Sequence, residues 1–472
     1  MEIFGHGQKQ DIQQILASRD RRVELQQRLV EKNPQYTLVS AKLNIPGPIK
    51  NSKLITQFFI DELLCFEHQL QQRGVLYKVA EEWLTAASGP ERFYLIKLDS
   101  FHVKQLTTQF EESAKQRRLF DLDVLTLFHE KVVSISREQL HQDPRKCLLC
   151  DQNAKECARS RKHSLEELQS KVTTLISETL ISTQKSQVAY QLSQIGVKAM
   201  IDEVTVWPKP GLVDPLEHGS HPDMDHFLFI KSALAIQNYL EQCAYVGLNY
   251  HGNSYQEVFE ELRTLGKRAE KTMFATTANV NTHKGVVFSL GIMTAAVSIG
   301  LNQAKLTEKN IQNIIQKMLV NLIKEDFSKQ STTPTAGEKQ YYKYKLGGIR
   351  AEAAAGYPVV FDYGLKTFNI AKDLPLNDRY IVTLMQIARH TEDSTLIKRA
   401  KDLNIIEWKN CQIDHFFDLG ATLTEKGREF LAQLQVDFTK RNLSLGGSAD
   451  LLILTIFVDE VERIFKDGLY HK

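Results

Sequence analysis

The hydrophobic pattern of this chain changes once, near residue 180, from mixed helical and extended segments to segments that are all helical. Before that point, β-branched strand-like runs alternate with amphipathic helices, whereas apolar faces with a helical period fill the remainder. A chain of 472 residues also exceeds what one hydrophobic core usually serves. We therefore expect an α+β domain over residues 1–178 and a mainly α-helical domain over residues 179–472.

In the first part, charged amphipathic patterns predict helices over 11–33 and 52–74, the second ending at Gly74. A β-branched run at 37–50 leads into a Pro-Gly-Pro turn, and the sequences "RFYLIKLDS" and "DLDVLTLF" predict two more strands. In the second part, helices are expected over 226–246, 254–278, 285–300, 307–327 and 448–465, with Ser448 as the N-cap of the last. The apolar run 286–301 is shorter than a typical membrane span, which favours a buried core helix.

The charge balance and the N-terminus limit the classes of function. The 59 Lys and Arg nearly match the 57 Asp and Glu, which argues against a broad nucleic-acid-binding surface. The start "MEIFGHGQKQDIQQI" lacks the apolar core of a signal peptide. Six Cys in a chain of this length indicate a reduced protein. We expect a cytoplasmic protein that binds neither nucleic acid nor a membrane.

Two carboxylates, Asp121 and Asp123, stand two residues apart in the strand-like "RRLFDLDVL". Side chains alternate along a strand, so both should lie on one face. Such a pair of oxygen ligands suits Mg²⁺ in phosphoryl or nucleotidyl transfer, and Arg117 and Arg118 could hold phosphate oxygens. The alternative is an edge strand with a solvated acidic face.

The stretch "CLLCDQNAKECARSRKH" places Cys147, Cys150, Cys157 and His163 close together. A CxxC pair with a further Cys and His resembles a zinc knuckle, but no second CxxC or HxxxH pair follows, so reduced structural thiols are favoured and a zinc site is the alternative. The neighbouring basic residues could bind the phosphates of a nucleotide-like ligand or form a solvated helix face; they are Arg145, Lys146, Arg159, Arg161 and Lys162.

A proline-bounded loop in the second part, within "EVTVWPKPGLVDPLEHGSHPDMDHF", concentrates ionisable side chains. Four of them could ligate Mg²⁺ directly or through water, and Lys209 could meet phosphate. Singly, each residue could instead be a helix cap or a surface charge. The four are Asp214, His221, Asp223 and Asp225, and Glu203 precedes them.

The polar stretch "NVNTHKG", residues 279–285, stands directly before the apolar run. Asn281 or Thr282 can cap a helix beginning near His283, and a helix N-terminus with Lys284 and the small Gly285 suits a phosphate. No GxxxxGK[ST] signature occurs. An ordinary capped helix explains the capping residues but not the adjacent His and Lys.

Two glycine-containing stretches complete the candidates. In "KLGGIRAEAAAGYP", Arg350 suits a triphosphate and Glu352 suits a metal ion or a sugar hydroxyl. In "LSLGGSADLL", Asp450 falls in the first turn of the last helix, where a negative charge is favourable without any further function.

Together these stretches resemble two known families. The first part is similar to apo-citrate lyase phosphoribosyl-dephospho-CoA transferases through "LNIPGPIKNS", "RLFDLDVL", "ISREQL" and "RKCLLCDQNAKECARSRKHS". The second is similar to triphosphoribosyl-dephospho-CoA synthases through "PKPGLVDPLEHGSHPDMD", "NTHKG", "GGIRAEAAAGYP" and "GGSADLL". Asn279 and Ala351 stand where the second family usually has Gly, and "RHTEDSTLIKRAK" departs from its usual pattern.

The resemblance implies a bifunctional enzyme that makes the citrate lyase prosthetic group. The second domain would join the triphosphoribosyl unit of ATP to dephospho-CoA and release adenine. The first would transfer phosphoribosyl-dephospho-CoA to a Ser of the citrate lyase acyl-carrier protein and release pyrophosphate. Mg²⁺ is the expected cofactor and ATP a substrate.

The residues fit these two steps. Carboxylates stabilise the positive charge of a breaking glycosidic bond, for which Glu203, Asp214, Asp223 and Glu352 are candidates, and a base must deprotonate the attacking hydroxyl. His221 or His283 could be that base, while Lys209, Lys284 and Arg350 grip the triphosphate. Asp121 and Asp123 are the candidates for the second step. The alternatives are a Mg²⁺-dependent hydrolase of ADP-ribose-type glycosides and a zinc-bearing binding module without enzymatic activity.

Overall fold

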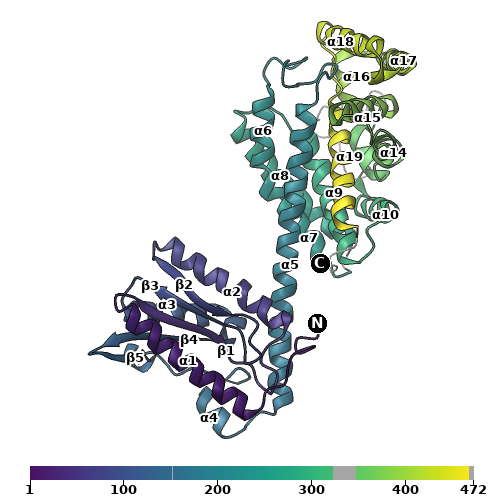
Figure 1. The fold of residues 1–472 in the computed structure, drawn as a ribbon. Coiled ribbons are helices and arrows are strands. Elements are labelled where there is room, and N and C mark those ends of the chain that lie inside the picture. The colour runs from purple at the N-terminus through teal and green to yellow at the C-terminus, as the bar shows by residue number, and fades with distance from the viewer. Residues whose placement is uncertain (151, 253, 323–346, 467–472) are drawn as a thin grey trace. The chain divides into compact units, whose positions relative to one another are not determined.

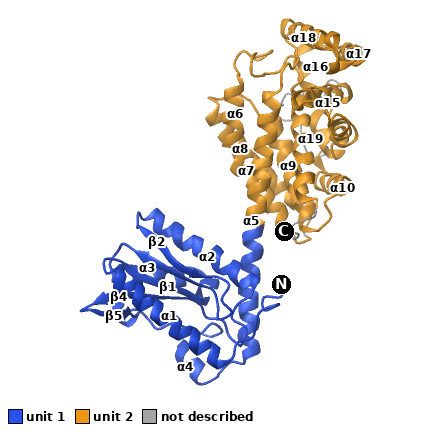
Figure 2. Ribbon diagram, viewed as in Figure 1, with its two compact units in different colours: residues 1–184 blue, residues 185–472 orange. Residues whose placement is uncertain are grey.

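The computed structural model describes residues 1–150, 152–252, 254–322 and 347–466. They form two compact units, residues 1–184 and 185–472 (Figure 2). The first unit combines a sheet with helices and the second is helical, which confirms the predicted fold class (Figure 1). The expected helix over 307–327 is present from residue 308, and its last part lies outside the described residues.

Unit 1 is built on a five-stranded antiparallel sheet in the order β2-β3-β1-β4-β5. Its strands are β1 (Thr37–Leu43), β2 (Tyr77–Trp83), β3 (Glu91–Ile96), β4 (Phe120–Phe128) and β5 (Lys131–Ile135). Its helices are α1 (Ile12–Lys32), α2 (Lys53–Gln72), α3 (Ser100–Glu112) and α4 (Ala154–Arg159). The helices and strands predicted for this part are therefore confirmed.

The two faces of the sheet are covered by different helices. On one face, Leu25 and Val30 of α1 pack against Leu38 of β1. On the other, the aromatic side chains of α2 and α3 surround Phe120, which begins β4. Side chains alternate between the two faces along a strand. Every second residue of β1 counted from Leu38, and every second residue of β4 counted from its partner Leu125, therefore faces α1.

The helix α5 (Leu165–Thr205) runs through the boundary between the units. Val172 and Ile176 belong to the core of unit 1, whereas Leu192 and Met200 belong to the core of unit 2. One continuous helix thus serves both units, and no loop marks the change of domain. The boundary placed at 178/179 from the sequence pattern falls inside this helix.

The described part of unit 2 is helical and includes the second half of α5. Its other helices are α6 (His226–Ala235), α7 (Gln237–Leu248), α8 (Tyr255–Thr276), α9 (Lys284–Asn302), α10 (Glu308–Met318), α13 (Gly348–Ala354), α14 (Leu365–Ile370), α15 (Leu376–His390), α16 (Ser394–Ala400), α17 (Ile405–Asp418), α18 (Glu425–Lys440) and α19 (Gly446–Phe465), with a π-helical turn η3 (Val360–Gly364). The single helix expected over 226–246 is two helices that meet at Ile236.

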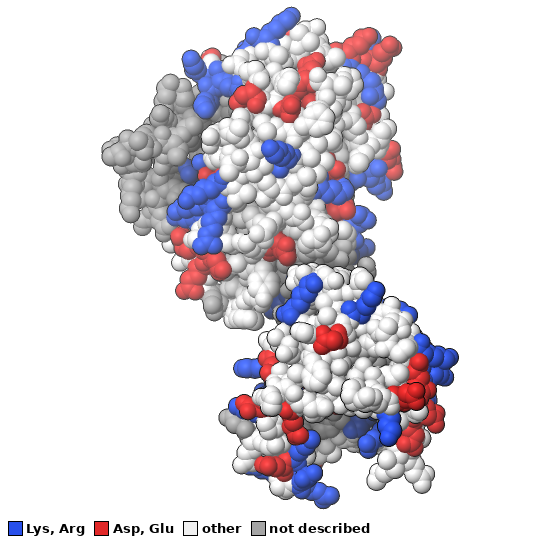
Figure 3. Space-filling model, turned by 90° about the vertical axis from the view of Figure 1, so that its left-hand side faces the viewer, with Lys and Arg blue, Asp and Glu red and all other residues white. Residues whose placement is uncertain are grey.

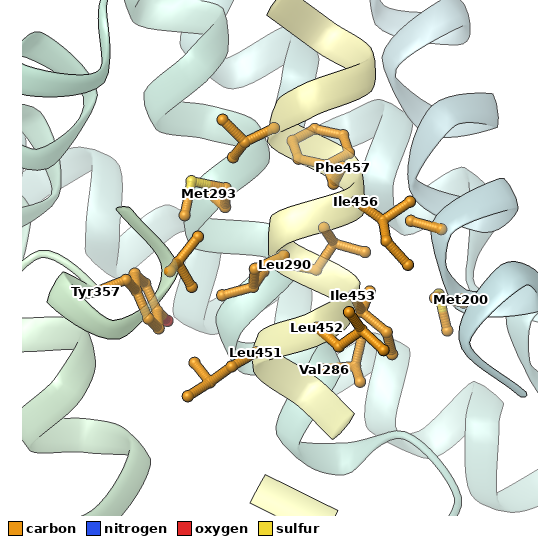
Figure 4. Close-up of a cluster of buried hydrophobic side chains, with 14 of the residues drawn as sticks. Met200, Val286, Leu290, Met293, Tyr357, Leu451, Leu452, Ile453, Ile456 and Phe457 are labelled. Atoms are coloured by element: carbon orange, nitrogen blue, oxygen red, sulfur yellow. The ribbon is translucent and has the colours of Figure 1, made fainter. Parts of the chain in front are cut away.

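Helices α9 and α19 form the centre of unit 2. Leu452 and Ile456 of α19 pack with Val286 and Leu290 of α9 and with Met200 of α5 (Figure 4). By length and composition α9 could cross a membrane, yet 83% of its apolar window is buried inside the unit. The interpretation of this run as a core helix is confirmed.

Helix α19 begins earlier than the sequence pattern predicts. The helix begins at Gly446, so Ser448 lies inside its first turn and is not the N-cap. Its backbone N–H and its hydroxyl instead both donate to Oδ2 of Asp393, at 2.9 and 3.0 Å. A side chain from a distant part of the chain thus satisfies the free N–H that a local cap would have served.

Candidate active sites

The strand register of unit 1 brings a lysine to the two predicted carboxylates. Lys42 of β1 pairs across the ladder with Asp121 of β4, and Asp123 follows on the same face. The Lys42 Nζ lies 2.8 Å from Asp121 Oδ2 and also contacts Asp123. The prediction that both carboxylates share one face is confirmed, and that face is the one covered by α1.

This cluster keeps its charges in the folded protein. Burial acts to raise the pKa of Asp121, but attraction to Lys42 and Arg145 outweighs it and holds that pKa below its ordinary value. Burial also acts to lower the pKa of Lys42, and the two carboxylates reverse that effect and raise it. Asp121 and Lys42 are therefore both ionised at neutral pH.

A pocket of about 480 Å³ lies beside this cluster. Arg145 connects the two, because its guanidinium lies 3.2 Å from Glu111 and 3.6 Å from Asp121. Four cationic side chains line the pocket, and these are Arg118, Arg137, Arg145 and Lys146. A polar cavity with this many cations suits a phosphate-rich ligand.

The structure separates the two predicted arginines. Arg118 lines the pocket and donates to the carbonyls of Lys146 and Cys147, at 2.9 and 2.6 Å. Arg117 instead pairs with Glu62 at 2.6 Å and lies over the Phe110 ring. Of the two, only Arg118 is placed in the pocket wall.

The four donors of the Cys/His cluster converge. The sulfur atoms of Cys147, Cys150 and Cys157 and a ring nitrogen of His163 all lie within 4.8 Å of one another. Burial and the neighbouring thiols raise the pKa of Cys157 to about 11. Burial acts in the same direction on Cys147, but backbone N–H groups of the CxxC turn donate to its sulfur and lower its pKa.

In unit 2, Glu203 and Lys209 form a buried ion pair. The Lys209 Nζ lies 2.5 Å from a carboxylate oxygen of Glu203 and 2.6 Å from its carbonyl oxygen. Lys209 is completely buried and Glu203 nearly so. The amine is thus held by Glu203 rather than presented to solvent, and its contact with phosphate stays a prediction.

A group of carboxylates gathers where α9 and α19 begin. A Cβ at Gly285 would lie 2.0 Å from Asp450 Oδ2, so the absence of a side chain there admits the Asp450 carboxylate. Its pKa lies well above the ordinary value because the surroundings desolvate it and because Asp393 and Glu203 are negatively charged nearby. A positive charge at this point would be strongly stabilised.

Asp393 also lines a second pocket, of about 300 Å³. The walls of this pocket include Gly347, Gly348, Glu352 and Gly447. Burial raises the pKa of Glu352, although the Val359 N–H donates to it at 2.8 Å. The predicted Arg350 lies in α13, between the wall residues Ile349 and Ala351.

The carboxylates of the 203–225 stretch do not share one site. Asp214 is buried and accepts from the backbone of Leu216 and Glu217 and from Gln435. Asp225 is the N-cap of α6. Among the residues that the structure describes, the Cys/His cluster is the only group of three or more His, Cys, Asp or Glu with converging donor atoms. Metal binding by Asp214, Asp223 and Asp225 stays a prediction.

His221 joins this stretch to the loop before α19. One ring nitrogen is 2.9 Å from the Ser444 hydroxyl, and the other accepts from Arg399 at 3.1 Å. Burial and the positive charge of Arg399 lower its pKa to about 4, so the ring is neutral at pH 7. Asp223 acts in the opposite direction, but less strongly.

The stretch 279–285 leads into α9, whose N-cap position is His283 without a side-chain capping bond, so neither Asn281 nor Thr282 is the predicted N-cap. The Asn281 side chain accepts from the Lys284 N–H at 3.3 Å, and Thr282 donates to Ser232 at 2.7 Å. Lys284 is half exposed and lies 3.1 Å from Glu270. His283 is buried, with Nδ1 2.9 Å from Ser232 Oγ, and its Nε2 has no partner.

Burial lowers the pKa of His283 to about 3, from 6.5 in an unfolded chain. Between these values the unfolded state binds more protons, so stability present at neutral pH is lost as the pH falls. From pH 7 to pH 5 the native chain should lose about 2 kcal/mol more than His283→Asn. Thermal unfolding of both proteins at the two pH values measures this difference. Equal losses would mean that His283 is accessible to protons in the folded state.

Sequence reasoning missed three residues of these sites. Lys42 is the single cation in an apolar strand, and only the register reveals its carboxylate partners. Arg137 reaches the first pocket by pairing with Glu111. Asp393 lies in a stretch that departs from the family pattern, so no motif pointed to it.

Comparisons with known proteins assign a family to each unit. Residues 189–468 match the model of the ATP:dephospho-CoA triphosphoribosyl transferase family (CitG). Residues 10–179 match that of the apo-citrate lyase phosphoribosyl-dephospho-CoA transferase family (CitX). The two matches define a transferase with two catalytic units.

Whole-length relatives have the same arrangement. Protein CitXG of Leuconostoc mesenteroides subsp. cremoris is 39% identical over 470 residues, covering 97% of this chain and 98% of that protein. Protein CitXG of Haemophilus influenzae is 32% identical, covering 96% of each. A probable 2-(5''-triphosphoribosyl)-3'-dephosphocoenzyme-A synthase of Lactiplantibacillus plantarum is 46% identical over 56% of this chain and 94% of that protein. The chain belongs to the CitXG family of bifunctional enzymes that make the citrate lyase prosthetic group.

Proposed function

We propose that each unit carries out one of the two reactions. Unit 2 would form triphosphoribosyl-dephospho-CoA from ATP and dephospho-CoA, and unit 1 would transfer phosphoribosyl-dephospho-CoA to the acyl-carrier protein. The observation that carries this division is the fit of each family match, 189–468 and 10–179, inside one compact unit. The domain assignment 1–178 and 179–472 stays within a few residues of the same boundary.

In the first reaction a ribose hydroxyl of dephospho-CoA attacks C1′ of the ATP ribose, and the bond to adenine breaks. Positive charge develops on the ribose, and carboxylates oppose it. Asp393 lines the second pocket and lies near Asp450, Glu203 also lies near Asp450, and this grouping supports a ribose site there. Lys284 and Arg350 are proposed to hold the triphosphate. The proposed acceptor of the hydroxyl proton is either His283, which is neutral and has a ring nitrogen without a partner, or His221.

In the second reaction a Ser hydroxyl of the carrier protein attacks the α-phosphorus, and pyrophosphate leaves. The cationic pocket beside Lys42 suits the leaving group, and Asp121 or Asp123 would receive the Ser proton. The same two carboxylates offer the oxygen donors that Mg²⁺ prefers, and bound there the ion would neutralise phosphate charge. Arg145, which contacts Asp121, would hold the phosphates in place.

Cutting the chain between residues 184 and 185 tests the division, because each fragment then keeps the residues of its own core. Fragment 185–472 should release adenine from ATP only when dephospho-CoA is present. Fragment 1–184 should modify the carrier protein when given the finished intermediate. Folded fragments that are inactive, beside an active full chain, would contradict the proposal.

A further inference from the structure

The Cys/His cluster has the dimensions of a metal site. The sulfur atoms of Cys150 and Cys157 are 3.9 Å apart, and the His163 Nε2 is 3.3 Å from the Cys150 sulfur. Zinc bonds of about 2.3 Å to sulfur and about 2.0–2.1 Å to nitrogen give tetrahedral edges of about 3.8 and about 3.5 Å. Bonded sulfurs would be about 2.05 Å apart, so these thiols are spaced as ligands and not as a disulfide.

The backbone around the cluster is built to hold these donors. The Cys147 N–H donates to the Gln152 carbonyl at 2.7 Å, and Lys146 bridges to Asn153, which closes a tight turn around the CxxC pair. Asn153 then caps α4, which carries Cys157, and His163 follows shortly before α5. Two donors from a turn, one from a helix and one from the next loop thus reach a common point.

We propose that Cys147, Cys150, Cys157 and His163 bind one structural Zn²⁺. Four protein donors close the coordination sphere, which is the arrangement of a structural rather than a catalytic zinc site. Cys147 and Cys157 are buried, and the other two are partly exposed, so the ion would be partly shielded from solvent.

The same segment positions the candidate transferase site. The carbonyls of Lys146 and Cys147 accept from Arg118, and the adjacent Arg145 contacts Glu111 and Asp121. A metal ion that fixes Cys147 would therefore also fix this wall of the first pocket. This consequence, unlike the metal binding itself, rests on the proposed function of unit 1.

The metal content of the purified full chain tests the site directly. We expect one zinc per chain, lost in Cys150→Ser and in Cys157→Ser. Cys65→Ser and Cys411→Ser, which change exposed cysteines outside the cluster, should keep it. Replacing zinc by Co²⁺ in the unmodified chain should give the visible absorption of a tetrahedral cobalt–thiolate site, a readout that needs no variant.

A chain without zinc that also fails to bind added Zn²⁺ or Co²⁺ would overturn the proposal, as would bound iron in place of zinc. Zinc removal should reduce carrier modification at least tenfold and leave adenine release unchanged. Bound zinc whose removal leaves carrier modification intact would overturn its positioning role. Bound zinc in a chain with neither activity would contradict the proposed function and leave the metal site standing.

Discussion

Replacing Asp121 and Asp123 together by Asn should abolish pyrophosphate release on carrier modification and leave adenine release unchanged. Among the described residues, these two carboxylates are the only acidic groups paired with Lys42. The double substitution removes both of them as proton acceptors and as metal ligands. Each such electrostatic contact is worth roughly 10²–10³ in rate, so modification should fall at least about 10³-fold. Pyrophosphate and adenine are measured in the same reaction mixture.

Asp20→Asn is the matched control, because Asp20 is an exposed residue of α1 in the same unit. It should leave both products unchanged. The double variant also removes two negative charges from Lys42, so its melting temperature must be compared with that of the native chain. Equal loss of both activities in a folded variant would contradict the division between the units.

The second large effect is expected from Asp450→Asn, which should reduce adenine release by about 10²–10⁴-fold. The change preserves the shape that Gly285 accommodates and removes the ionisable carboxyl group that would oppose the positive charge developing on the ribose. The raised pKa of Asp450 shows that the site disfavours an uncompensated carboxylate, so Asn should not destabilise the fold. Adenine release at saturating ATP and dephospho-CoA measures the effect.

Asp414→Asn serves as the control in unit 2, since Asp414 forms a half-exposed ion pair with Arg389. Its rate should equal that of the native chain. If Asp450→Asn releases adenine normally and melts at a higher temperature, the buried Asp450 carboxyl only destabilises the fold. The ribose site would then lie elsewhere.

The sequence predicted the elements and the fold class because their signals are local. Period-two alternation placed Asp121 and Asp123 on one face, and the apolar run gave α9. Asn279, where the family usually has Gly, lies at φ 66°, a left-handed conformation that Asn tolerates better than most residues. Residues that stand beside a local pattern of this kind can therefore be assigned to a helix, strand or turn without a structure.

The sequence could not predict which distant residues meet. Lys42 is 79 residues before Asp121, and their contact depends on the strand register. Asp393 reaches Ser448 across 55 residues. The residues of the 203–225 stretch are neighbours in sequence, yet Glu203 pairs with Lys209, Asp214 with Gln435 and His221 with Ser444 and Arg399.

The separation of the two active sites is tested most directly with the Asp450→Asn chain. This chain is given finished triphosphoribosyl-dephospho-CoA and acyl-carrier protein, and the mass of the carrier is measured. Our account predicts modification at the native rate, because unit 1 is intact and the defective step has been bypassed. A folded Asp450→Asn chain that leaves the carrier unmodified under these conditions would contradict it.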